Sequence, residues 1–277
     1  MLSSTPPKAS LIISVYKNTR FLDAVMKSLE DQTFREFEVI ISEDGESGEM
    51  EAYVKGLESS FPVYHLTQPD VGWRKNKALN RAIQAAKADW LVFIDGDCVL
   101  HPRFMEFHCQ LADDKSILAG KRVKLDAETS ERLIGGDYAL EKMGKVIRKN
   151  AAKIKKNGGA FLEEGVFIDP KGWLGFIPRL RKMSQLKGCN MSFHRKAIEA
   201  INGFDEDYVR PAVGEDIDLH WRFEGMGYHL KSVRNLAVQY HLWHKESWTD
   251  QEENMAMMRQ NQAKRQFVCK NGLKKLI

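Results

Sequence analysis

The sequence predicts an α/β fold, with a mostly parallel central sheet flanked by helices and a smaller region after it. Apolar runs alternate with stretches of helical spacing over the first hundred residues, which is typical of a parallel sheet with crossover helices. One run, residues 90–95, is apolar until its final aspartate, as expected for a strand buried on both faces. The chain has 277 residues, of which 43% are hydrophobic and 29% charged, and these values suit a large globular unit.

The spacing of apolar residues predicts the helices and strands of the first half. Residues 10–16 and 37–42 are apolar runs of strand length, and residues 18–31 between them place Val25 and Leu29 at helical spacing. A strand–helix–strand unit of this kind makes its two strands parallel neighbours. The same pattern predicts a helix over 47–58, a strand over 63–66, a helix over 73–87 and a strand over 90–95.

The second half is less regular. A helix is expected from His101 to about Leu111 and a strand over 117–125, whereas residues 127–187 show little periodicity. The remaining expected elements are an extended piece over 188–193, helices over 194–201 and 215–226, strands over 228–233 and 236–242, and a helical tail from Gln251.

Composition excludes several classes of protein. The net charge is only +4, so the whole chain is not a nucleic-acid binder by composition. No stretch approaches the ~20 apolar residues of a membrane span, and the first ten residues lack the charged-then-apolar order of a signal peptide. The four cysteines are scattered, which indicates neither a zinc site nor a disulfide framework. We therefore expect a reducing, cytoplasmic setting.

Two carboxylates, Asp95 and Asp97, follow the buried strand over 90–95 with one glycine between them. Ligands of open α/β sheets bind outside the carboxyl ends of the strands. A pair of acids there offers hard oxygen ligands to Mg²⁺ or Mn²⁺. The alternative is an Asp-Gly turn at a strand end, with no ligand at all.

Several motifs in their order along the chain resemble family 2 glycosyltransferases of the GT-A fold. The first-half motifs are Ser14-Val-Tyr16, Ile41-Ser-Glu43-Asp44-Gly45, Gly72-Trp-Arg-Lys75-Asn76 and Phe93-Ile-Asp95-Gly-Asp97. The second-half motifs, similar to the acceptor-side signature of that family and of galactosyltransferase-like C-terminal modules, are Gly188-Cys-Asn-Met-Ser-Phe, Asn202-Gly-Phe-Asp-Glu206 and Gly214-Glu-Asp-Ile-Asp-Leu219. The resemblance covers roughly residues 9–125 and 186–245. It implies a nucleotide-sugar half over 1–125, a variable basic insert over 126–185, and an acceptor and catalytic half with a helical tail over 186–277.

The resemblance implies a donor site for a UDP-sugar. A carboxylate after the second strand accepts the N–H of the base, and the pattern leaves this role between Glu43 and Asp44. Lys75 lies near the diphosphate, and Gly72 allows a close approach of the backbone. The residues implied in nucleotide-sugar binding are Ser14, Tyr16, Glu43, Asp44, Gly72, Lys75, Asn76 and Asp95.

The resemblance also implies a divalent cation, Mn²⁺ or Mg²⁺, held by Asp97 with Asp95. Relatives often have a histidine near the end of the last strand, where this sequence has His241 and His244. We favour His241 as the ligand and keep His244 as its rival. Both reach the site only if the chain turns between them, since strand positions three apart point to opposite faces.

The resemblance assigns catalysis to Asp216, as the base that takes the proton of the acceptor hydroxyl. Glu215 and Trp221 are then expected to bind the acceptor. The alternative is that acids in a first helical turn interact favourably with the helix dipole without any catalysis, and we expect Asp218 to do only that.

A basic segment that contains a tryptophan interrupts the resemblance. Lysines and arginines crowd residues 142–156, and the run Gly172-Trp173-Leu-Gly-Phe-Ile-Pro178 is followed by Arg179, Arg181 and Lys182. Apolar residues beside basic clusters are typical of proteins that lie on an anionic membrane surface. The alternative is a solvated helix followed by an ordinary buried loop.

The sequence therefore predicts an inverting, metal-dependent glycosyltransferase. The expected reaction moves a hexose or N-acetylhexosamine from a UDP-sugar to a glycan or lipid-linked oligosaccharide, in bacterial surface polysaccharide synthesis, at a cytoplasmic site that is peripheral to the inner face of the membrane. One alternative is a sugar-phosphate nucleotidyltransferase, which needs a glycine-rich basic loop after the first strand; Ser14-Val-Tyr-Lys-Asn is not one. The other is a non-catalytic module that binds a nucleotide sugar or a glycan.

Overall fold

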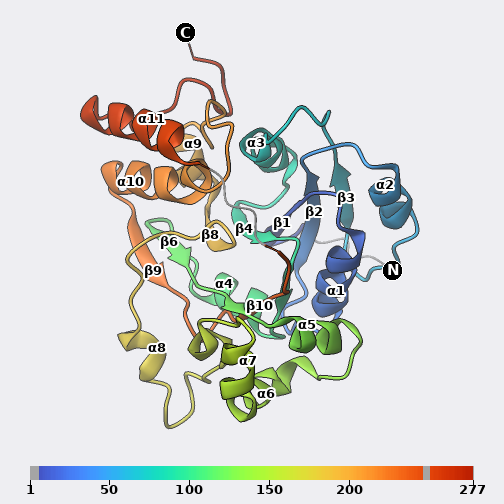
Figure 1. Ribbon diagram of the computed structural model, residues 1–277. Helices are drawn as coiled ribbons and strands as arrows, with labels where there is room; N and C mark the ends of the chain where they lie inside the picture. The colour runs from blue at the N-terminus through green and yellow to red at the C-terminus, as the bar shows by residue number, and fades with distance from the viewer. Residues whose placement is uncertain (1–5, 246–249, 277) are drawn as a thin grey trace.

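The protein, described by a computed structural model over residues 6–245 and 250–276, is built around a central sheet with helices on both faces (Figure 1). Seven strands lie in the order β3-β2-β1-β4-β8-β6-β9. All neighbouring pairs are parallel except those that β8 forms with β4 and β6. The predicted α/β architecture with a mostly parallel sheet is confirmed.

The strands of this sheet come from both halves of the chain. Their bounds are β1 Ala9–Val15, β2 Phe37–Glu43, β3 Val63–Leu66, β4 Trp90–Asp95, β6 Ser116–Ala119, β8 Asn190–His194 and β9 His229–Ser232. Strands β8 and β9, from the second half of the chain, thus join the same sheet as the strands of the first half.

Two hydrophobic cores cover the two faces of the sheet. Strand β4 contributes Val92 and Ile94 to one core and Leu91 and Phe93 to the other, which explains its unbroken apolar run. The first core includes helices α1 (Thr19–Glu30), α2 (Gly48–Lys55) and α4 (Phe104–Gln110). The second core includes α3 (Lys75–Ala85), α9 (Arg195–Ala200) and α10 (Asp218–Gly225).

A second, three-stranded sheet lies beside the first, with the order β5-β10-β7. Its strands are β5 Cys98–Leu100, β10 Gln239–His241 and β7 Val123–Lys124. The prediction of a single strand over 117–125 was wrong, because the chain leaves the first sheet after β6 and enters the second sheet as β7. The break lies at Gly120, where a Cβ would approach Asn190 Nδ2 to 2.4 Å, so the two segments pack too closely for any other residue.

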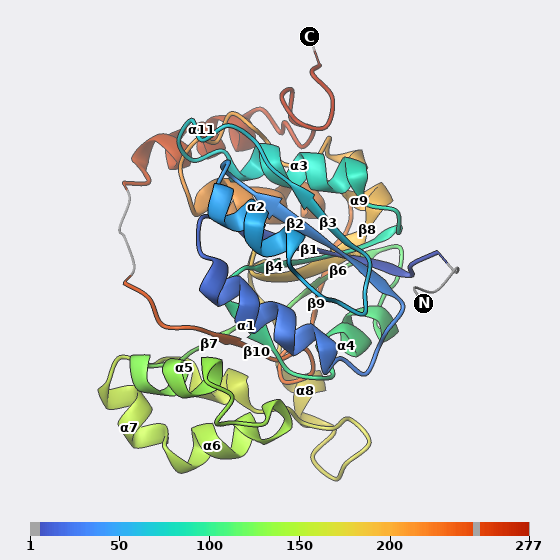
Figure 2. The ribbon, with the colours of Figure 1, turned by 90° about the vertical axis from the view of Figure 1, so that its right-hand side faces the viewer.

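The insert folds into short helices at one end of the molecule (Figure 2). They are α5 Ala127–Ile134, α6 Met143–Lys149, α7 Ala151–Lys156 and α8 Ile177–Leu180, with 3-10 turns at Leu140–Lys142 and Leu162–Gly165. Met143, Ile147 and Ile154 are buried and pack into the first core. The segment that showed little periodicity is therefore mostly helical, in pieces too short to give a clear repeat.

The catalytic motif expected on a helix over 215–226 begins instead as a π-helical turn, Val213–Ile217, and continues as α10. The last described helix is α11, Glu252–Ala263, which matches the first part of the expected helical tail; the described residues after it are not helical. None of the described helices is both long and apolar enough to cross a membrane.

Candidate active site

A cleft of about 920 Å³ lies where β1, β2 and β4 end, at the edge of the sheet that the βα series predicts for a ligand. Ten residues expected from the sequence line it: Ser14, Tyr16, Asp44, Gly72, Lys75, Asp95, Asp97, Glu215, His241 and His244. They come from six separate parts of the chain. The fold thus brings most of the expected site residues into one place.

The Asp95-Gly96-Asp97 turn is held tightly against β1. Gly96 N donates a hydrogen bond to Ser14 O at 2.8 Å, and a Cβ at Gly96 would lie only 2.7 Å from a Val15 methyl carbon. Glycine is required here by space. The close approach fixes both carboxylates at the floor of the cleft.

Asp95 lies between two cations. Its carboxylate oxygens lie 2.8 Å from Lys75 Nζ and 2.9 Å from Arg122 Nη1. Burial alone would raise the pKa of Asp95, but Lys75 and Arg122 outweigh it and hold the pKa below its usual value. The sequence did not single out Arg122; its one signal was a basic residue near the end of a predicted strand. Lys75 and Arg122 together place two positive charges beside Asp95 and Asp97.

Asp97 faces two histidines. Its Oδ2 lies 3.3 Å from His241 Nε2 and 3.2 Å from His244 Nε2, and the two ring nitrogens are 3.3 Å apart. Burial would raise the pKa of Asp97, yet hydrogen bonds from His241 and His244 leave it well below the usual value. Three potential ligand atoms therefore converge within 4.8 Å of one another.

The strand pairing explains how both histidines reach Asp97. Strand β10 runs antiparallel to β5 with His241 opposite Cys98, and Leu242 N donates to Asp97 O at 2.9 Å. The strand ends at His241, and Trp243 N donates to Ser130 Oγ at 2.8 Å, so the chain is no longer extended in the sheet. His241 and His244 therefore do not lie three apart on one continuous strand, where their side chains would point to opposite faces of the sheet.

This ligand set fits a divalent transition metal. One carboxylate and two imidazoles suit Mn²⁺ better than Mg²⁺, which prefers oxygen ligands alone. Asp95, Asp97 and Cys98 form a second possible group, but burial raises the pKa of the Cys98 thiol well above its usual value, so it does not offer a thiolate. The expected role of Asp95 as a ligand competes with its two ion pairs.

Asp44, and not Glu43, faces the cleft. The Asp44 carboxylate accepts hydrogen bonds from Gln68 Nε2 at 2.8 Å and Arg74 N at 2.7 Å. Glu43 is fully buried and lies 2.9 Å from His65 Nε2, so it cannot reach a ligand in the cleft. The choice left open by the sequence is therefore resolved by burial.

The rim of the cleft carries Tyr16, whose hydroxyl donates to Asp70 Oδ2 at 3.1 Å. Lys17 Nζ lies 2.6 Å from the same carboxylate. Gly72, two residues further on, has φ +81°, a backbone conformation that favours glycine, and apart from its chain neighbours no described protein atom lies within 4 Å of where its Cβ would be. The close approach of a ligand to its backbone stays a prediction. These contacts join the loop after β1 to the loop that precedes α3.

Glu215 and Asp216 approach from the acceptor side. Glu215 Oε1 lies 3.5 Å from Lys75 Nζ, and its buried Oε2 has no hydrogen-bond partner among the described residues. Asp216 is half-buried beside it, outside the residues that line the cleft, and its Oδ1 accepts from Ile217 N at 2.6 Å. Burial raises the pKa of both carboxyls, which makes each a stronger base than an exposed acid.

Comparison with known proteins decides the family. Residues 10–163, more than half of the chain, match the model described as "Glycosyl transferase family 2". The chain belongs to glycosyl transferase family 2. This is an inverting GT-A family, and the predicted resemblance is confirmed.

Curated relatives of this family 2 chain include two chondroitin synthases. That of Pasteurella multocida is 24% identical over 262 residues, which cover 88% of this chain and 26% of the relative. That of Escherichia coli is 25% identical over 239 residues, which cover 84% of this chain and 34% of the relative. The chain thus spans only about a quarter to a third of the length of these relatives.

Two solved structures share the fold at 14% identity. A mannosyltransferase from Pyrobaculum calidifontis, in complex with GDP-Man and Mn²⁺, has a TM-score of 0.56 over 92% of this chain and 61% of its own. A fragment of S. aureus TarS in complex with UDP-GlcNAc has a TM-score of 0.58 over 91% of this chain and 65% of its own. At this identity the likeness shows the GT-A fold alone.

Besides Glu43 and Asp216, two expected site residues of the family 2 chain do not line the cleft. Asn76 is buried, and its amide donates to Asp205 O at 2.8 Å and Gly214 O at 3.3 Å, so it attaches α3 to the acceptor-side loop. Trp221 donates from Nε1 to Asp218 Oδ1 at 3.2 Å and packs against Phe267. In the structure Asn76 and Trp221 have packing and positioning contacts, and their ligand contacts stay predictions.

Asp218 is a structural acid. It is fully buried, with Arg222 Nη1 at 2.9 Å and the Tyr208 hydroxyl donating to it at 3.0 Å. The Asp218 charge is therefore paired inside the protein. The expectation that Asp218 only interacts with the helix dipole was wrong.

Asn190, which the sequence offered only as part of a motif, connects three segments of the site. Its amide donates to Lys121 O at 3.2 Å and Ala237 O at 3.1 Å, and its own oxygen lies 3.0 Å from His108 Nε2. Burial lowers the pKa of His108 to about 4, so the ring is neutral and donates from Nε2.

The segments that Asn190 joins carry the charged groups of the cleft. In the sheet Asn190 pairs with Ile94, the residue before Asp95. Lys121 precedes Arg122, and Ala237 begins the approach to His241. One buried amide thus fixes the spacing between the acid, the arginine and a histidine. A single amide offers no periodicity or motif spacing from which this role could be read.

Proposed function

We propose that this family 2 chain transfers a hexose or N-acetylhexosamine, with inversion, from a UDP-sugar to a glycan or lipid-linked saccharide. One observation carries the proposal: a single cleft joins two cations, an Asp-His-His cluster and Glu215, and Asp216 follows Glu215 in the chain. A diphosphate leaving group needs the positive charges, and an attacking hydroxyl needs a base. The cleft offers the charges, and Asp216, next to the lining residue Glu215, would be the base.

The donor would lie over the ends of β1, β2 and β4. Asp44 would accept the N–H of the base, Asp95 would bind the ribose, and Lys75 and Arg122 would approach the diphosphate. In support, Asp44 and Asp95 both line the cleft, and the TarS neighbour was solved with UDP-GlcNAc. The mannosyltransferase neighbour was solved with GDP-Man, so the base is the part of the donor that needs a direct test.

Asp97, His241 and His244 would hold the cation, Mn²⁺ in preference to Mg²⁺. A bound cation supplies charge neutralisation to the departing diphosphate. The Mn²⁺ in the mannosyltransferase neighbour supports this choice of metal. The cleft also leaves this group open to a ligand, since His241 is buried but the His244 side chain is 39% exposed.

Asp216 would act as the general base. The acceptor oxygen forms its bond to the anomeric carbon, the bond from that carbon to the diphosphate oxygen breaks, and the hydroxyl proton passes to Asp216. Its raised pKa supports this role, because a stronger base takes the proton more readily. Glu215, which lines the cleft with one unpaired oxygen, would bind the acceptor.

We also propose a cytoplasmic location at the inner face of a bacterial membrane, in surface polysaccharide synthesis. The chondroitin synthase relatives support a polysaccharide product. The nucleotidyltransferase alternative lacks its phosphate loop, since Asn18 after β1 caps α1 by accepting from Phe21 N at 3.0 Å. A binding module would have no use for a base beside the cation set.

A panel of UDP-, GDP-, ADP- and dTDP-sugars, each with Mn²⁺, tests the proposal. We expect one UDP-sugar to raise the melting temperature and to release UDP slowly, and faster when oligosaccharide acceptors are present. Stabilisation by that UDP-sugar without any release of UDP would favour the binding module. No response to any UDP-sugar would overturn the UDP assignment, and release of pyrophosphate from a nucleoside triphosphate would favour the nucleotidyltransferase.

A further inference from the structure

The loop before and within α8 exposes large apolar side chains. The exposed fractions are 88% for Trp173, 55% for Phe176 and 71% for Leu180. Trp173 and Leu180 are the two most exposed large hydrophobic residues of the described chain. A tryptophan left almost wholly in water is unusual, because its burial is strongly favourable.

Basic residues surround these apolar side chains. Lys171, Arg179 and Lys182 are exposed in the same segment, and none has an acidic partner in the part of the chain that the structure describes. Residues 142–182 carry eleven of the 42 Lys and Arg but only three of the 38 Asp and Glu. Without this stretch the chain would be net negative, so its positive charge is local.

The basic helices and the apolar loop share one end of the molecule. In both Figure 1 and Figure 2, α6, α7 and the loop at α8 lie at the end opposite α3 and α11. Lys145, Lys149, Lys155 and Lys156 are exposed on α6 and α7, whereas Lys153 pairs with Glu128 at 2.6 Å. An extended surface can therefore contact the loop and the helices at once.

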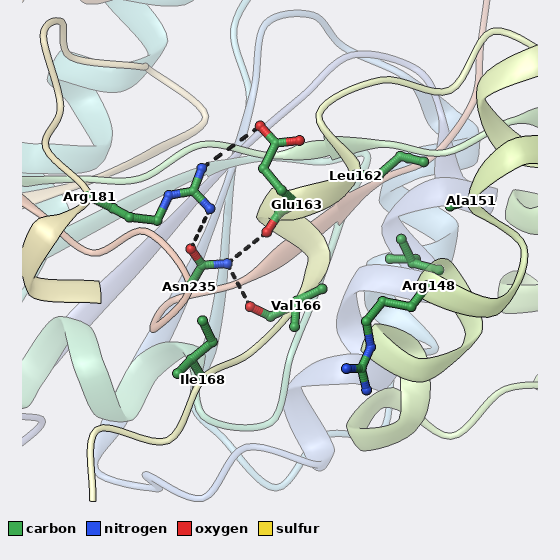
Figure 3. A pocket seen from close by; sticks show the side chains of 9 residues that line it. Arg148, Ala151, Leu162, Glu163, Val166, Ile168, Arg181 and Asn235 are labelled. Carbon is green, nitrogen blue, oxygen red and sulfur yellow. Dashed lines mark hydrogen bonds and ion pairs between the residues drawn. The ribbon is translucent and has the colours of Figure 1, made fainter. Parts of the chain in front are cut away.

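The loop is held out from a fixed base. Arg181, at its foot, donates to Asn235 Oδ1 at 2.8 Å and to the buried Glu164 at 3.0 Å, and Arg234 donates to Glu164 as well. Figure 3 shows Arg181 and Asn235 beside a small cleft of about 330 Å³ that Leu162 and Ile168 also line. The exposure of Trp173 thus follows from an anchored loop.

We propose that residues 142–182 form a docking surface for an anionic lipid bilayer. Trp173, Phe176 and Leu180 would enter the headgroup region, where apolar and aromatic side chains bind favourably. The lysines of α6 and α7 would meet the anionic headgroups. The charge excess favours anionic lipid over a neutral surface, and the apolar loop favours lipid over a dissolved polyanion. The region matched by the family model ends at residue 163, before this loop.

Flotation with vesicles tests the surface without any sugar donor, so its failure would leave the proposed transfer reaction untouched. We expect the protein to float with phosphatidylcholine vesicles that contain phosphatidylglycerol and to stay unbound with phosphatidylcholine alone. Half-molar salt should weaken the binding, because it screens the charges.

Two variants separate the loop from the helices. Trp173→Ala with Phe176→Ala and Leu180→Ala should abolish flotation, and Lys149→Gln with Lys155→Gln and Lys156→Gln should lower the affinity by roughly two orders of magnitude. The matched control, Lys264→Gln with Lys270→Gln and Lys274→Gln, removes the same charge from exposed positions at the other end of the molecule and should float as the parent does.

Three outcomes would overturn the proposal. In the first, the parent protein does not bind the anionic vesicles. In the second, the control variant loses as much vesicle binding as the α6–α7 lysine variant. In the third, the protein binds heparin or an acidic protein but not the vesicles. Circular dichroism and the melting temperature of each variant show whether it is folded, and all the changed side chains are exposed.

Discussion

The cleft and the docking surface are both rich in charge, but they arrange it in opposite ways. In the cleft each charged group faces a partner: Asp95 lies between Lys75 and Arg122, and Asp97 faces two histidines. On residues 142–182 most basic side chains are exposed and have no acidic partner among the residues described, 6–245 and 250–276. Paired, partly buried charges are fixed in geometry, whereas exposed unpaired charges act through their number and sign. Substitutions in the cleft should therefore lower the rate of transfer, and substitutions on the docking surface should lower membrane binding.

The largest effect should come from Asp216→Asn. The amide keeps the shape of the side chain but cannot accept the proton, so kcat should fall at least ~100-fold. UDP affinity, measured by calorimetry, should stay within about twofold, since Asp216 does not line the cleft. Asp207→Asn, an exposed carboxyl nearby, is the control and should keep normal kcat. Near-normal transfer by Asp216→Asn would reject the base assignment.

The next effect concerns the two histidines. If both bind the cation, His241→Ala and His244→Ala should each weaken Mn²⁺ affinity by at least ~10-fold, because even residues behind a metal ligand commonly cost that much. Equilibrium dialysis or the paramagnetic signal of free Mn²⁺ measures this affinity. His229→Ala, an exposed histidine on β9, is the control. A loss confined to one histidine would leave the other with a packing role.

Asn190→Ala tests whether one amide positions the cleft. It removes hydrogen bonds to Lys121 O and Ala237 O and leaves buried groups unpaired, which should cost about 1–3 kcal/mol of unfolding free energy. Beyond that loss, we expect about tenfold lower kcat/KM for the fraction that is folded. Ser192→Ala, which removes the other partner of His108, is the control for stability alone. Lost stability with unchanged kinetics would show a structural role only.

The dependence of kcat on pH should reflect the raised pKa of Asp216. The base acts when ionised, so kcat should fall as pH drops through that pKa. Burial raises the pKa, and the acid limb should therefore lie above the ordinary aspartate range near ~4. Initial rates between pH 4 and 8 at saturating donor measure the limb. An inflection at or below the ordinary value would contradict the assignment.

The smallest effect on chemistry should come from the docking surface. Trp173→Ala with Phe176→Ala and Leu180→Ala should leave kcat on a dissolved acceptor within about twofold, as is usual for surface substitutions. The same protein should lose its vesicle binding. A large fall in kcat on the dissolved acceptor would show that the surface belongs to the catalytic unit.

Much of the fold could be predicted because burial on both faces leaves a strong signal. The runs at 10–16, 37–42 and 90–95 correspond to β1, β2 and β4 within about a residue at each end. The strand expected over 117–125 failed because its apolar pattern continues across a change of sheet. Close packing of Gly120 against Asn190, which are far apart in sequence, causes that change.

The site was predictable where a motif carries it. Asp44, Lys75, Asp95 and Asp97 follow strands or begin a helix, and the fold brings such positions to one edge. Arg122 and Asn190 act through partners more than twenty residues away, so no local pattern shows their roles, although Asn190 lies within a family motif. Asn76 and Trp221 have the residue types of ligand contacts, but tertiary packing turns them to other partners.

The affinity for UDP with and without Mn²⁺ tests the central claim most directly, because the claim is that one cleft holds both nucleotide and cation. Titration calorimetry with the parent protein should give binding in Mn²⁺ that weakens at least ~10-fold in a chelator, since coupled ligands raise each other's affinity. In Asp97→Asn that difference should largely disappear. Equal UDP affinity with and without the metal, or no UDP binding under either condition, would contradict the account.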